Sequence, residues 1–189
     1  RSFLNYAGPI MQEIFGKQND EWGIENLHRL YTNVEPGFIR VDADEVTYPA
    51  HIILRYRLER ALISGDLSLP DLPTAWNDGM KKLLGIEPPN NRLGCLQDIH
   101  WPSGDFGYFP TYTLGAMTAA QLYSTAKLDM PYVESEIEQG KFETLINWLR
   151  KNIHSHGSRF SADQLLNMVT GSSLDPGVFQ SHLKNRYLN

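Results

Sequence analysis

The chain has 189 residues, of which 41% are hydrophobic, and this is enough apolar material for one sizeable core. Its 17 lysines and arginines are outnumbered by 22 aspartates and glutamates, and the net charge of -5 argues against a surface for nucleic acid or anionic lipid. The single cysteine excludes an intramolecular disulfide, and the sequence contains neither a membrane-length apolar run nor a signal-peptide pattern. We therefore expect a soluble, cytoplasmic, globular protein without nucleic-acid or membrane partners.

Two helices are expected at the N-terminus. Apolar residues recur at helical spacing over residues 2–15, where Gly8-Pro9 predicts a kink or a restart. A second stripe covers residues 22–31, and residues 16–20 are expected to form the turn between the two helices.

Residues 33–44 contain a Pro-Gly pair that breaks helical structure and presents Arg40 on an irregular segment. Three carboxylates follow Arg40 closely, those of Asp42, Asp44 and Glu45. Such a cluster by itself indicates a structural network of salt bridges. A guanidinium is also the planar, always-charged donor that binds a free carboxylate in a bidentate manner. The residues alone favour the salt-bridge interpretation of Arg40.

Residues 48–64 are predicted to form a long helix, with Pro49 suited to its first turn and Gly65 to its C-terminal cap. Its arginines are interpreted as a solvated or salt-bridged face, formed by Arg55, Arg57 and Arg60. A proline-punctuated connection over residues 66–73 leads into a shorter helix over residues 75–84.

The stretch from Gly94 to Pro110 has the densest polar chemistry in the chain. An amide, a carboxylate and an imidazole fall within four residues, at Gln97, Asp98 and His100. Aromatic residues then alternate with glycines and prolines, at Trp101, Phe106, Tyr108 and Phe109. Single polar residues in a helical protein are commonly caps or satisfied core groups, but this density indicates part of an active site.

Cys95, inside the same stretch, is interpreted as a small buried hydrophobe rather than a nucleophile.

The remainder of the chain is predicted to be helical. Helical patterns cover residues 112–126, 130–138 and 142–153, and two further helices begin at a Ser161/Gln164 capping box and at Asp175-Pro176. The sequence shows neither an internal repeat nor an interdomain linker. We therefore expect an all-α fold organised essentially as one domain over residues 1–189.

Two motifs resemble signatures of the M32 family of metallocarboxypeptidases, the thermostable carboxypeptidase type. The pattern GxxQDxHW is filled by Gly94, Gln97, Asp98, His100 and Trp101, and the pattern IRxxAD by Ile39, Arg40, Ala43 and Asp44. The resemblance extends over essentially the whole chain, yet the sequence contains no His-Glu pair and hence no HExxH zinc motif. In relatives that motif, the third zinc-ligating Glu and the HPF and DxRxT motifs lie N-terminal to the part matched here. The resemblance therefore implies the C-terminal helical portion of a longer, mostly helical, zincin-like carboxypeptidase.

The resemblance also implies roles for individual residues. The full-length enzyme would release C-terminal amino acids from peptides with a zinc ion, or cobalt in its place, whose ligands lie outside this chain. This chain would supply the opposite wall of the cleft, with Arg40 binding the substrate carboxylate and Asp42 or Asp44 orienting it. His100 or Tyr108 would donate to the oxyanion or to the terminal carboxylate, and Tyr112 is a weaker candidate for that role.

The same resemblance places Gln97 and Asp98 in the substrate-binding set as supporting groups. Asp98 would accept a hydrogen bond either from a zinc-bound histidine or from His100. The resemblance further implies a homodimer when the protein is full length, and the isolated chain is expected to be inactive.

Two alternatives use the same residues differently. In the first, the chain is a non-catalytic helical binding module, the QDxHW stretch is structural and the acidic surface docks a partner helix. In the second, Asp98 and His100 join His154 and His156 in a metal site within this chain, although this spacing matches no compact zinc pattern.

Overall fold

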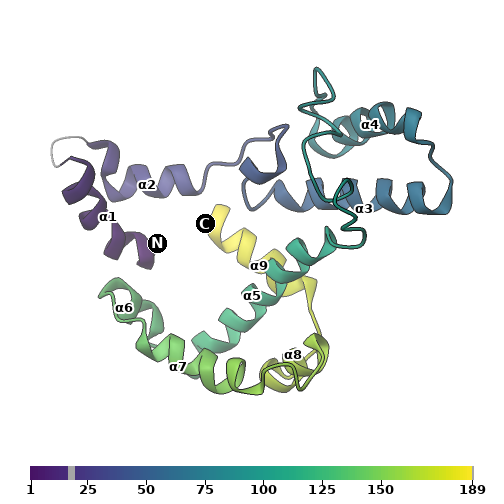
Figure 1. Cartoon of the computed structure of the whole chain (residues 1–189). Coiled ribbons are helices and arrows are strands. Elements are labelled where there is room, and N and C mark those ends of the chain that lie inside the picture. The colour runs from purple at the N-terminus through teal and green to yellow at the C-terminus, as the bar shows by residue number, and fades with distance from the viewer. Residues whose placement is uncertain (17–19, 189) are drawn as a thin grey trace. The chain divides into compact units, whose positions relative to one another are not determined.

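The structure, a computed structural model, describes residues 1–16 and 20–188, and the regular elements assigned among them are all helices (Figure 1). The prediction of an all-α fold is therefore confirmed for the described part of the chain. The turn predicted over residues 16–20 falls largely on residues 17–19, outside the described residues. The chain divides into two compact units, residues 1–33 with 117–189 and residues 34–116. The expectation of a single domain stays a prediction.

The first unit contains most of the helices. They are α1 (Ser2–Phe15), α2 (Ile24–Tyr31), the part of α5 (Pro110–Asp129) from residue 117 onward, α6 (Val133–Glu138), α7 (Glu143–Asn152), α8 (Ala162–Thr170) and α9 (Pro176–Tyr187). Helix α1 packs against α2 and α6, and the Tyr6 ring lies edge-on to Phe142 with centroids 5.4 Å apart. Pro9 lies inside α1 without ending it, so the helix continues through this residue rather than restarting.

The predicted helix starts in this unit are confirmed by their caps. The Ser161 hydroxyl accepts from the Gln164 backbone N–H, and the Gln164 side chain accepts from the Ser161 N–H, which completes a capping box before α8. Asp175 accepts from the Gly177 N–H before α9. Between these helices, the buried Gln121 side chain of α5 donates to Thr170 and anchors the α8–α9 connection.

The second unit carries the candidate site. Its helices are α3 (Tyr48–Ser64), α4 (Leu72–Leu84) and residues 110–116 of α5, with single 3-10 turns at Arg40–Asp42 and Leu69–Asp71. Helix α3 has the predicted bounds, and Gly65 closes it in the left-handed conformation at φ 81°. Helix α4 begins three residues earlier than expected because Pro73 lies in its first turn, where proline is tolerated, rather than in the preceding connection.

The core of this unit lies between α3 and α4. Its buried members are Leu54, Leu58, Leu72, Trp76, Met80 and Cys95. The two helices approach closely at Gly79, where an added Cβ atom would collide with Cδ1 of Leu54. The burial of Cys95 confirms its interpretation as a hydrophobe, and burial raises the pKa of its thiol. Residues 85–109 follow α4 as turns and irregular backbone that cross the surface of this core.

Helices of membrane-spanning length and apolarity do not occur in the described ranges 1–16 and 20–188.

Candidate active site

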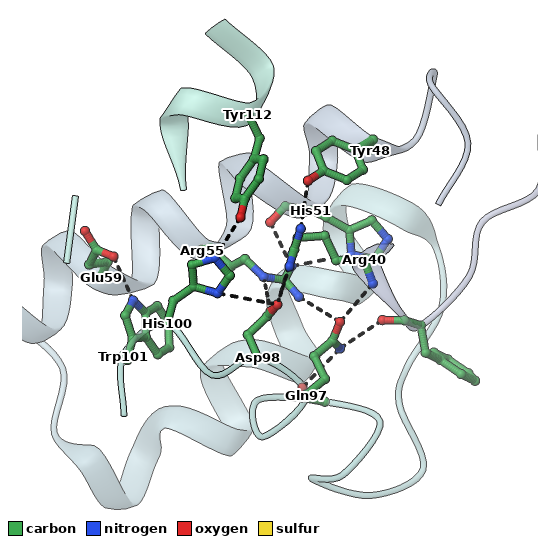
Figure 2. Close-up of polar contacts among 12 residues, drawn as sticks. Arg40, Tyr48, His51, Arg55, Glu59, Gln97, Asp98, His100, Trp101 and Tyr112 are labelled. Atoms are coloured by element: carbon green, nitrogen blue, oxygen red, sulfur yellow. Dashed lines mark hydrogen bonds and ion pairs between the residues drawn. The ribbon is translucent and has the colours of Figure 1, made fainter. Parts of the chain in front are cut away.

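Asp98 is the centre of a buried polar cluster in the second unit, where it contacts Arg55 of helix α3. Figure 2 shows the guanidinium groups of Arg40 and Arg55 converging on its carboxylate. Oδ1 accepts from Nε and Nη2 of Arg40 at 3.0 and 2.7 Å, and Oδ2 accepts from Nε of Arg55 at 2.6 Å. Burial alone would raise the pKa of Asp98, but the two guanidiniums together hold it below its ordinary value. Two cations therefore share one carboxylate.

Gln97 ties the same two arginines to the polypeptide backbone. Its Oε1 atom accepts from the Arg40 backbone N–H at 2.9 Å and from Nη2 of Arg55 at 2.8 Å. Its Nε2 atom donates to the carbonyls of Phe38, Leu93 and Gly94 at 3.0–3.1 Å. A side-chain amide with all of these contacts is fixed in orientation, so Gln97 holds the segment that carries Arg40 against the segment that carries Asp98.

The carboxylate that contacts the Arg40 guanidinium is not one of the two that were predicted. The carboxylate that orients its guanidinium is Asp98, and Nη1 donates to the Tyr48 hydroxyl at 2.7 Å. Asp44, one of the two alternatives expected for this role beside Asp42, instead accepts from the backbone N–H groups of Glu35, Val46 and Thr47, just before α3. The Arg40 side chain is only 7% exposed.

Aromatic rings surround the Arg40 guanidinium. Its central carbon lies 5.0 Å from the ring centroid of Tyr112, 5.7 Å from that of Phe109 and 5.8 Å from that of Tyr48. Such distances give favourable cation–π contacts. The contacts with Asp98 and Tyr48 use three of the five N–H donors that an arginine carries.

His100 lies between Asp98 and an aromatic cluster. Its Nε2 atom is 2.9 Å from the Tyr112 hydroxyl, and its Nδ1 atom is 3.9 Å from Oδ1 of Asp98. Nδ1 is buried and makes no hydrogen bond within the described part of the chain. The ring of Phe109 lies beside the imidazole, with centroids 4.3 Å apart. Tyr112, the weaker candidate from the sequence, is therefore the direct partner of His100.

Tyr108 lies at the exposed edge of the cluster. It is 49% exposed, and its ring centroid is 5.7 Å from that of His100 and 5.4 Å from that of Tyr112. The structure thus brings the predicted site residues into one region of the second unit. Arg40, Gln97 and Asp98 are joined by direct hydrogen bonds, whereas His100 and Tyr108 are joined to them through ring contacts and near approaches.

Arg55 and Glu59 on α3 belong to the cluster and were not expected there. Of the two interpretations of the α3 arginines, Arg55 fits the salt-bridged one and not the solvated one, because its side chain is fully buried, pairs with Asp98 and lies over the Trp76 ring at 4.6 Å. Burial lowers the pKa of Arg55 to about 10, against the charge of Asp98, so the guanidinium stays protonated at neutral pH. The signal in the sequence is their spacing of four residues beside the apolar positions Leu54 and Leu58, which turns both side chains toward the core.

The residues of this cluster do not fit a metal ion. Both oxygens of Asp98 accept from guanidinium groups, whose positive charge opposes binding of a cation at the same carboxylate. Residues 1–16 and 20–188 contain no group of three or more His, Cys, Asp or Glu side chains that could hold a metal. The alternative in which Asp98 and His100 share a metal with His154 and His156 therefore has no support in the described chain.

Comparison with known proteins identifies the family to which this chain is similar. The model of the Carboxypeptidase Taq (M32) metallopeptidase family matches residues 1–187. The chain is 39% identical over 188 residues to Thermostable carboxypeptidase 1 of Pyrococcus furiosus, and the match covers 100% of this chain and 38% of the relative. It is 40% identical over 179 residues to Carboxypeptidase 1 of Bacillus subtilis, covering 95% of this chain and 36% of the relative.

Solved structures agree with this result. Metallocarboxypeptidase 1 of Trypanosoma cruzi superimposes with a TM-score of 0.95 at 40% identity, covering 100% of this chain and 39% of that one. The chain thus spans less than two-fifths of the length of the relatives that it matches. A family match over residues 1–187, together with this structural agreement, shows that the chain belongs to the M32 family of carboxypeptidases.

Proposed function

We propose that this chain forms the substrate-carboxylate wall of a metallocarboxypeptidase that releases C-terminal amino acids from peptides. Family membership supports the reaction class, and the observation that carries the role of this chain is the sharing of Asp98 by Arg40 and Arg55. The metal, zinc or cobalt in its place, would be held by residues outside this chain. A homodimeric assembly and a cytoplasmic location are further parts of this proposal.

The charge balance of the cluster favours an anionic ligand. Within hydrogen-bond distance of Asp98, two guanidiniums face one carboxylate, an excess of one positive charge there, because the buried carboxylate of Glu59 accepts from Trp101 and Gly107 and not from an arginine. An uncompensated buried charge costs several kcal/mol, so an anion that entered the site would relieve that cost. The terminal carboxylate of a peptide is such an anion, and a guanidinium matches its planar, bidentate geometry.

Arg40 is the arginine that the substrate would reach. Two of its N–H groups remain beyond those used by Asp98 and Tyr48, whereas Arg55 is fully buried. Because Arg40 is only 7% exposed, the carboxylate would contact it after a local shift of the aromatic rings beside its guanidinium that keeps the Tyr112 hydroxyl on His100. Asp98 and Gln97 would keep the guanidinium in place during that shift.

His100 and Tyr108 would supply hydrogen-bond donors to the oxyanion or to the terminal carboxylate. Tyr112 would fix the orientation of His100, since its hydroxyl lies 2.9 Å from Nε2. Tyr108, which is half exposed on an irregular segment, would meet a substrate without a large movement of the backbone. Donors held in this way stabilise a developing negative charge because they need little reorganisation during the reaction.

The test is Arg40→Ala in the full-length product of the gene that encodes this chain. We expect kcat/KM for peptides with a free C-terminus to fall by about a hundredfold, the scale of losing a buried charged partner. Peptides with an amidated C-terminus should be affected much less, and Arg57→Ala, which changes an exposed arginine on α3, serves as the control. Equal losses on the free and amidated peptides would show that Arg40 does not bind the carboxylate.

A further inference from the structure

Glu59 holds both ends of the segment that joins His100 to Tyr108. Its Oε2 atom accepts from Nε1 of Trp101 at 2.7 Å, and its Oε1 atom accepts from the Gly107 backbone N–H at 2.5 Å. The side chain is 5% exposed, so both hydrogen bonds are shielded from water. One carboxylate on α3 thus fixes two points that are six residues apart in the sequence.

The segment between these two points has few other attachments to the core. Residues 102–108 are all exposed, and their backbone hydrogen bonds stay within the segment or reach its neighbours at residues 99–101 and 111. Gly107 adopts φ 78°, a left-handed conformation that glycine enters without strain, and its N–H then meets Glu59. The placement of the segment relative to the core therefore depends strongly on Glu59.

Each end of the segment adjoins a candidate donor. Trp101 directly follows His100, and Gly107 directly precedes Tyr108. A carboxylate can accept from both N–H groups with full charge, whereas an amide offers one acceptor oxygen and would turn its NH2 group toward the second donor. Burial of this carboxylate is costly unless both oxygens are satisfied, which matches the two contacts observed.

We propose that Glu59 is a positioning residue that holds His100 and Tyr108 at the spacing their role requires, an inference that rests on the function proposed above. Glu59 acts on these two side chains indirectly, through its hydrogen bonds to Trp101 and Gly107. Arg55 lies one helical turn away and holds Gln97 and Asp98. Helix α3 therefore carries both side chains that hold the site residues in place, Arg55 for Gln97 and Asp98 and Glu59 for the segment between His100 and Tyr108.

The first measurement is hydrogen exchange in the full-length protein, compared between wild type and Glu59→Gln. We expect amide exchange over residues 102–109 to rise by about tenfold or more, while helix α4 keeps its protection. Trp101→Phe removes one of the two donors and should give a smaller rise in the same peptide. Glu87→Gln changes an exposed glutamate that pairs with Lys81 and is the matched control. Unchanged exchange over residues 102–109 in Glu59→Gln would overturn the proposal.

The second measurement is a double-mutant cycle on peptide hydrolysis. We expect Glu59→Gln to lower kcat by about tenfold with KM changed less than about twofold, because misplaced donors act in the transition state. In a Tyr108→Phe background the same substitution should cost clearly less, since the hydroxyl that Glu59 positions is already absent. Additive losses, or full activity in Glu59→Gln, would overturn the positioning role. An inactive wild type would instead refute the proposed reaction, and hydrogen exchange would still decide whether Glu59 anchors the segment.

Discussion

Nε of Arg55 donates to Oδ2 of Asp98 at 2.6 Å, and this pair joins the middle of helix α3 to the segment that carries His100. The Arg55 side chain is fully buried and the Asp98 side chain is 11% exposed. An ion pair in such a setting responds strongly to the loss of either partner, because the remaining charge keeps its desolvation cost.

Replacement of Arg55 by methionine should destabilise the protein. Breaking a buried pair costs about 3–5 kcal/mol, and we expect a value near the lower end because Arg40 still contacts Asp98. Urea unfolding of the variant measures this free energy. Arg57→Met, two residues further along the same helix and exposed, should change stability by no more than about 0.5 kcal/mol. Similar effects of the two substitutions would contradict a buried charged role for Arg55.

Stability should depend on pH through His51, which is fully buried on α3. Burial, and then the charges of Arg55 and Arg40, lower the pKa of His51 from 6.5 to about 4. The unfolded state therefore binds more protons between these two values, so this stabilisation is complete above pH 6.5 and is lost as the pH falls toward 4. The loss amounts to about 3 kcal/mol.

The free energy of unfolding, measured between pH 7 and 4, tests this expectation. His51→Gln should remove the corresponding slope, whereas His154→Gln, at an exposed position, should leave it unchanged. The same slope in wild type and in His51→Gln would show that another group is responsible.

Gly107→Ala should strain the backbone of the segment held by Glu59. At φ 78° a Cβ atom destabilises the folded state by about 1–2 kcal/mol through backbone strain, even though open space surrounds the position. Gly115, inside α5 and also in open space, is the opposite case, and Gly115→Ala should stabilise the helix by roughly 0.5–1 kcal/mol. Thermal or urea unfolding of the two variants should give shifts of opposite sign. A stabilising Gly107→Ala would contradict the observed conformation.

The 189-residue chain by itself should neither retain a metal nor hydrolyse peptides. The cluster around Asp98 is occupied by arginines, and the described residues offer no group of metal ligands. Elemental analysis and a blocked-dipeptide release assay, with added zinc or cobalt, should give no stoichiometric metal and no turnover. Chelator-sensitive activity of the isolated chain would refute this expectation and the assignment of roles that depends on it.

Much of the fold followed from local signals in the sequence. The capping box at Ser161 and the glycine at Gly65 marked helix ends correctly because these signals act within one turn of the helix. The predicted start of α4 is too late because Pro73 is equally compatible with a connection and with a first helical turn. The residues around Pro73 therefore did not show whether it lies in the connection or in the first turn of α4.

The site was only partly predictable. Motifs point to Arg40, Gln97 and Asp98, but they suggest the nearby carboxylates of Asp42 and Asp44 as partners of Arg40. Asp44 is already used by the backbone before α3, and the actual partner of Arg40 lies 58 residues away. Arg55 and Glu59 escape prediction for the same reason, because their partners lie 42–48 residues further along the chain. The apolar periodicity of a helix shows which of its faces is buried. It does not show which distant residue pairs with a charged side chain on that face.

The sharing of one carboxylate by two arginines also constrains how this sequence can change over time. Loss of either arginine alters the charge felt by the other, and loss of Asp98 leaves two buried cations in proximity. Substitutions at these three positions should therefore show strong epistasis, so that each is tolerated only in company with a compensating change. Mutational drift would be slow here, whereas the exposed arginines on the outer side of α3 are free to vary independently.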